Sequence, residues 1–364
     1  MVGVVPIDAL EARAYRIPTD APEADGTLEW EATTLVVVTA GAGNVRGTGY
    51  SFADAGAVGV ANRTLAAEIL GENAMDVPRL WDRMRRRVRN MGSGGIAAGA
   101  VSAVDTALWD LKAGLVGLPL ADLWGARRDA VPIYGSGGFT SYDDDRLAEQ
   151  LAGWVSEDGC GRVKMKIGAD RRDAERRMTR AKEAIGEEAR LMIDANGACT
   201  PREALAIAEI ADGLGVDWFE EPVTSDDLEG LAFVRGGLPG AVDCAAGEYV
   251  YGPHDARRML EARAVDCLQL DATRCLGYTG FLQAAALAEA FAIPISAHTA
   301  PALHLPVCRA APGLRHIEWF HDHVRIEAML FEGAPVPRDG AIAASTAAGH
   351  GLTFKTKDAE RFAL

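Results

Sequence analysis

The pattern of apolar and polar positions changes character about one third of the way along the chain. Before that point, residues 4–15 and 35–39 are rich in apolar and β-branched residues, which favour strands. The segment between them, residues 18–30, is polar and predicts a loop. Apolar residues at helical spacing predict three helices, at residues 58–70, 78–90 and 96–115. This part therefore predicts an α+β domain over residues 1–125.

From about residue 131, short apolar runs alternate with longer amphipathic stretches. The apolar runs are residues 131–134, 163–167, 191–193, 218–219, 242–246, 265–270, 293–296 and 317–319. Helices are predicted over residues 170–185, 201–213, 255–262 and 278–291. Eight such units in succession indicate a closed parallel α/β barrel rather than an open sheet, over residues 126–334. The remaining segment, residues 335–364, is expected to return to the N-terminal domain.

The composition fits one barrel with a smaller partner domain. The chain has 364 residues, of which 49% are apolar and 24% are charged, so a large core can form. Its net charge of −15 argues against a nucleic-acid partner, because phosphates require a basic face. None of the six cysteines forms a CxxC pair, and no secretory or transmembrane segment is predicted. We therefore expect a cytoplasmic protein with reduced thiols and no membrane partner.

Ionisable residues follow the predicted barrel strands at their carboxyl ends, where the active sites of such barrels lie. In chain order they are Lys164 and Lys166, Asp194, Glu220 and Glu221, Glu248, Asp271, His298 and Glu318, and Asn196 follows Asp194. Seven consecutive strands thus bring an ionisable group to one rim. Isolated buried charges are costly, so a purely structural core would not place them there.

The carboxylates Asp194, Glu220 and Glu248 follow three neighbouring strands. If they converged without a cation, they would repel one another and raise each other's pKa. A hard divalent cation removes this repulsion, and ligands that are all oxygen suit Mg²⁺. We therefore predict one Mg²⁺ in the active site. The periodicity does not distinguish Glu220 from Glu221 as the ligand.

Two further pairs of residues flank the predicted metal. Lys164 and Lys166 face the same side of their strand, and mutual repulsion beside a divalent cation would lower their pKa, which allows one to act as a base. Asp271 could fix the tautomer of His298 on the adjacent strand. Two bases would then face a substrate from opposite sides. Such bases could remove the proton next to a substrate carboxylate, which forms an enolate. A general base contributes only about 10²–10⁴ in rate to this step. The larger effect must be stabilisation of the enolate charge by the metal, Lys164 and a protonated Glu318.

At these residues the sequence resembles the enolase superfamily, mandelate racemase subgroup. The matching motifs are Val163-Lys164-Met165-Lys166, Ile193-Asp194-Ala195-Asn196, Trp218-Phe219-Glu220-Glu221-Pro222, Gly247-Glu248, Asp271 and Ser296-Ala297-His298. Residues 100–110 also resemble the helix at the domain junction of that family. The resemblance implies a modified TIM barrel, (β/α)7β, with an α+β N-terminal capping domain. Cap loops near residues 18–30 and 50–56 would set specificity.

The resemblance also implies a metal site. Asp194, Glu220 and Glu248 would bind Mg²⁺. Glu221 would lie behind these ligands, and Asn196 would line the site.

The roles of the remaining residues follow from the same resemblance. Lys166 would be one base, and His298, oriented by Asp271, would be the base or acid on the opposite face. Lys164 would polarise the substrate carboxylate. Glu318 would bond one of its oxygens.

Three functions remain open at this point. Dehydration of an acid sugar to a 2-keto-3-deoxy acid is favoured, because most activities in the resembled subgroup are of this kind and His321-Asp322-His323 suits a polyhydroxylated substrate. Racemisation or epimerisation of a 2-hydroxy acid starts from the same enolate. A non-catalytic binding protein is the third, and the intact lysines and His298 argue against it. A small carboxylate is the expected partner, and self-association as a homo-oligomer stays open.

Overall fold

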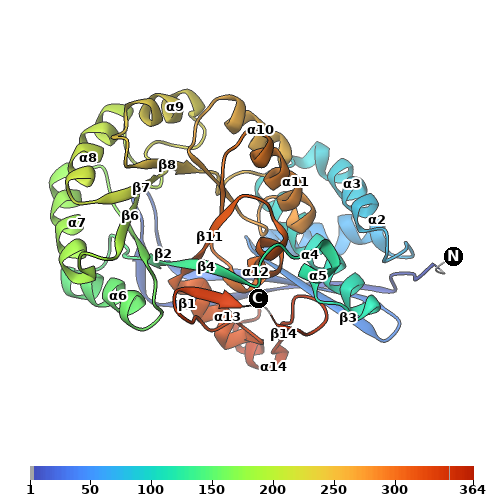
Figure 1. Cartoon of the computed structure of the whole chain (residues 1–364). Helices are drawn as coiled ribbons and strands as arrows, with labels where there is room; N and C mark the ends of the chain where they lie inside the picture. The colour runs from blue at the N-terminus through green and yellow to red at the C-terminus, as the bar shows by residue number, and fades with distance from the viewer. Residues whose placement is uncertain (1–3, 344) are drawn as a thin grey trace.

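A closed barrel of eight parallel strands forms the main body of the computed structural model, which describes residues 4–343 and 345–364 (Figure 1). The strands are β4 (Ala130–Gly137), β5 (Arg162–Lys166), β6 (Arg190–Asp194), β7 (Val216–Glu220), β8 (Asp243–Ala246), β9 (Cys267–Leu270), β10 (Ile295–Ala297) and β11 (Leu314–Phe320). Each strand pairs with the next along the chain, and β11 pairs with β4, where Ile317 lies opposite Ile133. All eight apolar runs are therefore strands of one barrel, as predicted.

Seven helices connect these strands and form the outer ring seen in Figure 1. They are α6 (Asp144–Ser156), α7 (Arg171–Ile185), α8 (Pro201–Gly213), α9 (Leu228–Gly237), α10 (Pro253–Glu261), α11 (Gly277–Ala290) and α12 (Pro301–Ala310). The start of α8 shows how the sequence sets a boundary. Thr200 and Glu203 form a reciprocal capping box around Pro201 at the first helical position. The arrangement confirms the predicted (β/α)7β barrel.

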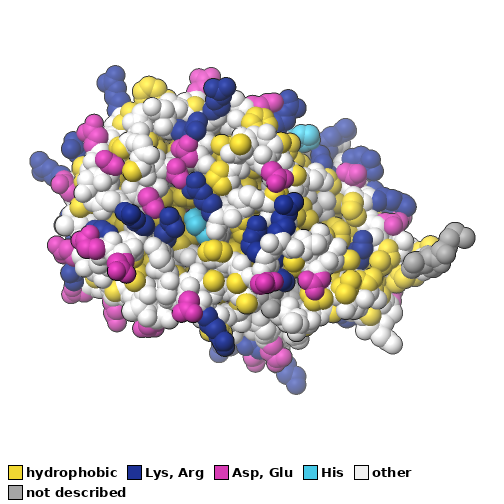
Figure 2. All heavy atoms as spheres, in the orientation of Figure 1, with side chains coloured by type: hydrophobic (Ala, Val, Ile, Leu, Met, Phe, Trp, Pro, Cys, Tyr) yellow, Lys and Arg dark blue, Asp and Glu magenta, His cyan; other side chains and the backbone are white. Residues whose placement is uncertain are grey.

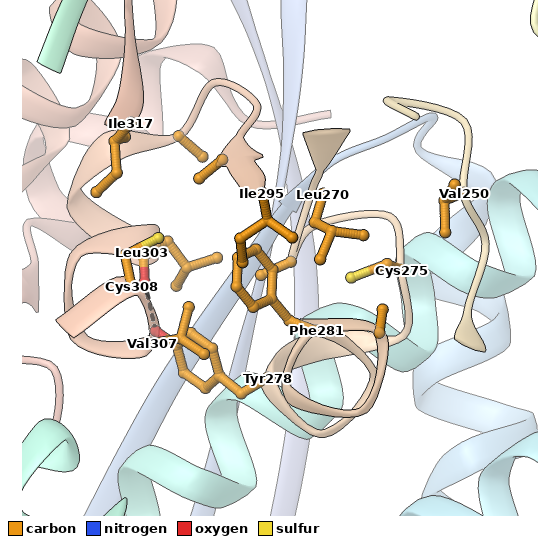
Figure 3. Packing of buried hydrophobic residues seen from close by; sticks show 14 of the residues in the cluster. Val250, Leu270, Cys275, Tyr278, Phe281, Ile295, Leu303, Val307, Cys308 and Ile317 are labelled. Atoms are coloured by element: carbon orange, nitrogen blue, oxygen red, sulfur yellow. Dashed lines mark hydrogen bonds between the residues drawn. The ribbon is translucent and has the colours of Figure 1, made fainter. Parts of the chain in front are cut away.

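Apolar contacts between the strands and the outer helices fix the barrel wall. Figure 3 shows Leu270 of β9 and Ile295 of β10 directed towards Phe281 of α11, and all three side chains are buried. The hydroxyl of Tyr278 on α11 donates a 2.8 Å hydrogen bond to the backbone oxygen of Leu303 on α12. Close packing of this kind transmits any displacement to neighbouring elements. The strand ends that carry the predicted ionisable residues are therefore held by a rigid layer.

The N-terminal part is a three-stranded antiparallel sheet covered by helices. The strands are β1 (Ala9–Ala24), β2 (Glu29–Ala42) and β3 (Val45–Phe52). The helices are α1 (Gly56–Gly59), α2 (Ala66–Ile69), α3 (Val77–Val88), α4 (Gly95–Val116) and α5 (Leu120–Trp124), with a π-helical segment at Val60–Leu65 and a 3-10 turn at Arg89–Met91. A Cβ at Gly47 of β3 would lie 2.2 Å from the backbone nitrogen of Leu111, so glycine allows α4 to approach the sheet.

The prediction of a loop at residues 18–30 is wrong. β1 continues to Ala24 and β2 begins at Glu29, so this segment is a hairpin with a short turn. Oδ1 of Asp25 accepts the backbone N–H groups of Thr27 at 2.6 Å and Leu28 at 2.8 Å, which stabilises the turn. Polar residues dominate because many positions of the hairpin are exposed or half-buried. Polarity alone does not separate such a hairpin from a loop.

The segments after the barrel contact both parts of the molecule. They are α13 (His321–Leu330), β12 (Phe331–Glu332), β13 (Ala341–Ala343), β14 (Thr353–Phe354), α14 (Thr356–Ala359) and a 3-10 turn at Glu360–Phe362. β13 pairs antiparallel with barrel strand β4. The backbone N–H of Leu364 donates to the oxygen of Ala14 on β1 at 3.0 Å, and the rings of Phe354 and Tyr15 lie 5.3 Å apart. This segment therefore links the barrel to the N-terminal sheet.

On the face shown in Figure 2, lysine and arginine side chains are interspersed with aspartate and glutamate. All six cysteines are buried and free. Among the described residues, no helix combines the length and the apolar character needed to cross a membrane.

Glu327 of α13 is a buried carboxyl group between the barrel and the N-terminal sheet. It accepts hydrogen bonds from the hydroxyl of Tyr50 on β3 and, at 3.0 Å, from the backbone N–H of Ala302 on α12. Burial raises its pKa from an ordinary value of 4.5 to about 8. The folded protein therefore holds this proton more tightly than the unfolded chain. The stabilisation is complete below pH 4.5 and is lost as the pH rises through 8.

Glu327→Gln is therefore expected to reduce the loss of stability between pH 5 and pH 8, because the amide stays neutral across this window. Urea unfolding of the parent and the variant at both pH values measures the effect. Glu332→Gln, at an exposed position on β12, is the matched control and should leave the parental pH dependence intact. Equal pH dependence in parent and Glu327→Gln would contradict the expectation.

Candidate active site

A cavity of about 270 Å³ lies at the carboxyl ends of the barrel strands, beneath the β1–β2 hairpin. Its lining includes five predicted residues, which are Lys166, Asn196, Glu248, His298 and Glu318. The other predicted residues do not line the cavity but lie next to this lining. They are Lys164, Asp194, Glu220, Glu221 and Asp271. The hairpin packs tightly beside the cavity, because a Cβ at Gly26 in the hairpin turn would lie 2.4 Å from the backbone oxygen of Ala195. The hairpin thus rests directly on the barrel rim.

Three buried carboxylates converge as predicted. Asp194, Glu220 and Glu248 each offer one oxygen, and these oxygens all lie within 4.8 Å of one another. Burial, with the charge of Asp194 added, raises the pKa of Glu220 to about 8. Oε2 of Glu248 is buried and, among the described residues, its nearest cationic group is Nε2 of His298 at 3.4 Å. Three buried carboxylates that converge in this way fit a hard divalent cation such as Mg²⁺.

Glu221 has a different environment from Glu220. Its backbone φ is +36°, and its Oε1 accepts a hydrogen bond from the hydroxyl of Ser225. Burial and the charge of Glu248 raise its pKa well above the ordinary range. Glu220 instead receives a 3.0 Å hydrogen bond from Nε1 of Trp218 and shares the three-carboxylate cluster. The geometry therefore favours Glu220 over Glu221 as a ligand.

The two lysines face the carboxylates from β5. Nζ of Lys166 lies 2.5 Å from Oδ2 of Asp194, and Nζ of Lys164 pairs with Glu220 and, at 2.9 Å, with Oε1 of Glu318. Burial lowers the pKa of Lys166, but the surrounding carboxylates outweigh burial and raise it to about 12. The pKa of Lys164 is also raised. Each ammonium here faces carboxylates, and the lowered lysine pKa expected beside a divalent cation stays a prediction.

His298 and Asp271 form the predicted pair on the opposite side of the cavity. Nδ1 of His298 lies 3.0 Å from Oδ2 of Asp271, and Oδ1 of Asp271 accepts the N–H of Thr273 at 2.7 Å. Nε2 of His298 lies 3.4 Å from Oε2 of Glu248. Burial lowers the pKa of His298, but Glu248, Glu318 and the bond to Asp271 raise it to about 10. When protonated, the imidazole could donate the proton on Nε2.

Glu318 is a buried carboxyl group beside Lys164 and His298, and the protonated Glu318 expected beside a bound substrate stays a prediction. Burial raises its pKa, but the charges of Lys164 and His298 outweigh burial and lower it to about 2. Its oxygens accept hydrogen bonds from the hydroxyl of Ser136 at 2.5 Å and from the N–H of Thr299 at 2.9 Å. These two donors, one on β4 and one in the loop after β10, stabilise the negative charge of this carboxylate.

Among the site residues that were not predicted from the sequence, Arg274 and Trp218 each bond a carboxylate of the cluster. Arg274 lines the cavity, and its Nη1 donates to Oε1 of Glu248 at 3.1 Å. Trp218 holds Glu220 through the bond described above. A signal for Trp218 was present, because it precedes Glu220 by two residues and so faces the same side of β7. Arg274 follows Asp271 in the loop after β9, where no periodicity predicts its direction.

The cap and the segment that follows the barrel form the upper wall of the cavity. Asp25, Trp30, Ala32 and Thr33 come from the cap, Phe320 ends β11, and His323 lies on α13. His321 does not line the cavity; its Nε2 lies 3.0 Å from Oδ2 of Asp20 on β1. Of the three residues 321–323 that the sequence singled out for a polyhydroxylated substrate, only His323 lines the cavity.

Gly26→Ala is expected to lower kcat/KM by about tenfold or more, because the added Cβ would push the hairpin off Ala195 and displace the upper wall. Steady-state kinetics with the best substrate measures this effect, and thermal unfolding shows whether the rest of the fold is retained. Gly153→Ala is the control, since a Cβ at that position meets nothing within 4 Å. Equal kcat/KM for the parent and Gly26→Ala would argue that the hairpin does not form the substrate wall.

Comparisons with known proteins agree with this geometry. The family model described as the N-terminal domain of mandelate racemase/muconate lactonizing enzyme matches residues 14–125, and the model described as enolase C-terminal domain-like matches residues 146–359. The L-talarate/galactarate dehydratase of Salmonella typhimurium is 32% identical over 317 residues, which are 85% of this chain and 77% of that protein. Its crystal structure with Mg and L-lyxarohydroxamate has a TM-score of 0.91 at 27% identity, covering 99% of this chain and 93% of that chain.

Two further solved structures cover almost the whole chain. A mandelate racemase/muconate lactonizing enzyme-like protein from Rubrobacter xylanophilus has a TM-score of 0.96 at 44% identity, covering 99% of this chain and 100% of that chain. A racemase from Streptomyces coelicolor with bound magnesium has a TM-score of 0.93 at 27% identity, covering 98% of this chain and 100% of that chain.

Proposed function

Because the chain belongs to the mandelate racemase/muconate lactonizing enzyme family, we propose that it is a Mg²⁺-dependent enzyme that removes the proton α to a substrate carboxylate. The reaction we propose is dehydration of an acid sugar to a 2-keto-3-deoxy acid. Support comes from the similarity to an acid-sugar dehydratase over most of both chains. The observation that carries the proposal is that two proton-transfer groups, Lys166 and His298, line the cavity from β5 and from the loop after β10.

We assign the metal to Asp194, Glu220 and Glu248, the three carboxylates that converge within 4.8 Å. Mg²⁺ bound there would stabilise the negative charge that develops on the carboxylate oxygens of the substrate. Lys164, which is buried beside Glu220 and Glu318, would add positive charge at the same oxygens. Asn196 lines the cavity, and its buried Oδ1 accepts no hydrogen bond, so it would be available to a substrate hydroxyl.

The proton steps follow from the two flanking groups. Lys166, once neutral, would take the α-proton, and the electron pair of that C–H bond would move towards the carboxylate group to form an enolate. The enolate would return this pair to form the Cα–Cβ double bond as the C–O bond to the β-hydroxyl breaks and His298 donates its proton to the departing oxygen, which leaves as water. Asp271 holds Nδ1 of His298, so that Nε2 carries the transferred proton. The resulting enol becomes the 2-keto acid.

Racemisation or epimerisation is the second candidate. The same two-sided arrangement would allow His298 to return a proton to the α-carbon instead of to a β-hydroxyl, and a racemase from Streptomyces coelicolor has a similar fold over almost the whole chain. A catalytically silent binding protein is disfavoured, because every group needed for proton transfer is present in one cavity.

Incubation with Mg²⁺ and a panel of sugar acids and 2-hydroxy acids in D₂O separates these functions, with proton NMR as the readout. A 2-keto-3-deoxy product supports the dehydratase. Deuterium at the α-carbon of an intact, inverted substrate indicates the racemase or epimerase. Failure of every acid to exchange or react, with Lys166→Ala indistinguishable from the parent, would contradict the enzymatic proposal.

A further inference from the structure

The cations of the active-site cavity are confined to one wall. Among the described residues that line it, Lys166, Arg274 and His298 are the cationic side chains, and all three stand on the barrel. Each is paired with a barrel carboxylate: Lys166 with Asp194, Arg274 with Glu248, and His298 with Asp271. This wall, with its carboxylate cluster, can receive one substrate carboxylate.

The opposite wall offers uncharged or acidic groups. The hydroxyl of Thr33 donates to Asp322, so its oxygen remains free to accept a hydrogen bond. Nε1 of Trp30 donates to Oε2 of Glu23 at 2.9 Å, which leaves the indole ring to face the cavity. Asp25 adds a carboxylate to the same wall.

His323 on this wall is a neutral donor. Its Nδ1 accepts the backbone N–H of Ala300 at 3.3 Å, which places the proton on Nε2. Burial lowers its pKa well below the ordinary range, and the ring stacks on Phe52 with centroids 3.4 Å apart. A neutral imidazole of this kind can donate to a hydroxyl but does not balance a second carboxylate.

The residues behind this wall are predominantly acidic. Asp20, Glu23 and Asp322 lie there, with Glu23 fully buried. Nη2 of Arg325 lies 2.5 Å from Oδ1 of Asp322 and donates a 2.6 Å hydrogen bond to the backbone oxygen of Pro18. Arg146 lies 3.6 Å from Asp20. Neither arginine lines the cavity, so neither supplies a free cation to it.

We propose that the substrate is a monocarboxylic sugar acid, an aldonate, whose carboxylate lies at the barrel wall and whose uncharged hydroxylated end lies against Asp25, Thr33 and His323. This inference rests on the proposed function and specifies its substrate class. An aldarate of the same length would place a second carboxylate beside that of Asp25, where no cation lines the cavity, and the two like charges would repel. Hydroxyl groups, in contrast, match the acceptors and the donor of this wall.

Matched pairs of acids test the proposal, for example gluconate against glucarate and galactonate against galactarate. Turnover is measured with the Mg²⁺-loaded parent, and affinity is measured by titration of Mg²⁺-loaded Lys166→Ala, which should bind without turnover. We expect at least a tenfold preference for the aldonate in affinity, and in kcat/KM for the pair that reacts. Equal or tighter binding of the aldarates, or no binding by either class, overturns the inference. If both acids bind but neither is turned over, the result counts against the proposed function. The ratio of the two affinities still decides the substrate class.

A charge-removing variant locates the origin of the preference. Asp25→Asn keeps the oxygen that accepts the turn N–H groups of Thr27 and Leu28 and removes the negative charge. This variant should reduce the ratio of aldonate affinity to aldarate affinity by about tenfold. Glu29→Gln, on the exposed side of the same hairpin, is the control and should leave the preference unchanged. An unchanged preference in Asp25→Asn, or an equal change in Glu29→Gln, rejects Asp25 as the source of discrimination.

Discussion

Replacement of His298 by asparagine is expected to lower kcat for dehydration by about 10²–10⁴-fold, because the variant has no proton to donate to the departing hydroxyl. Asparagine can still bond to Asp271, so the loss should reflect chemistry rather than unfolding. Steady-state kinetics gives the loss in kcat. Exchange of the α-proton in D₂O, followed by NMR, should continue because Lys166 is intact.

Lys166→Ala should behave in the opposite way and lose both exchange and dehydration. His254→Asn is the matched control, since His254 is exposed on α10 and does not line the active-site cavity. If His298→Asn also abolished exchange while Lys166→Ala retained it, the two roles would be reversed. Equal activity of all three variants would reject the assignment of both residues.

Glu220→Gln is expected to abolish Mg²⁺-dependent activity, with a loss of at least about 10³-fold, because the neutral amide removes one charged ligand from the three-carboxylate cluster. The melting temperature provides a readout besides activity. Mg²⁺ should raise the melting temperature of the parent, since a ligand that binds only the folded state stabilises it, and should fail to raise that of the variant.

Glu221→Gln tests whether Glu220 or Glu221 is the metal ligand, which the sequence pattern did not decide. Glu221 lies outside the three-carboxylate cluster and bonds Ser225, so the amide removes none of the assigned ligands. This variant should keep the Mg²⁺-dependent rise in melting temperature. The reverse result, with metal response lost in Glu221→Gln and kept in Glu220→Gln, would move the ligand assignment to Glu221.

The barrel could be predicted because its strands are buried on both faces and its helices on one. Such strands appear as short apolar runs, and all eight runs proved to be barrel strands. The β1–β2 hairpin could not be predicted in the same way. Pro18 and the acidic residues near Asp25 suggested a loop, whereas the pairing that makes them a hairpin depends on the length of both strands. Tertiary contacts of Gly26 with the barrel rim leave no periodic signal.

The positions of the site residues were more predictable than their protonation states. Alternation along β5 put Lys164 and Lys166 on one side, and the carboxyl-end rule for barrels brought His298 to the same cavity as Lys166. A pKa, in contrast, depends on every charge nearby. The pKa of Glu318 is lowered despite burial, because β5 and the loop after β10 place Lys164 and His298 beside it. Single-strand patterns do not contain these distances between strands.

The pairing of β11 with β4 has a consequence for how the chain is made. Until β11 is synthesised, β4 and β10 each leave a row of backbone groups unpaired, and such open edges promote association between chains. The same late strand carries Glu318, whose bond to Ser136 on β4 crosses the closing pair of strands. A partly synthesised chain therefore lacks a residue of its active site and is prone to aggregate. Recovery of native enzyme should depend on how quickly this last pairing forms.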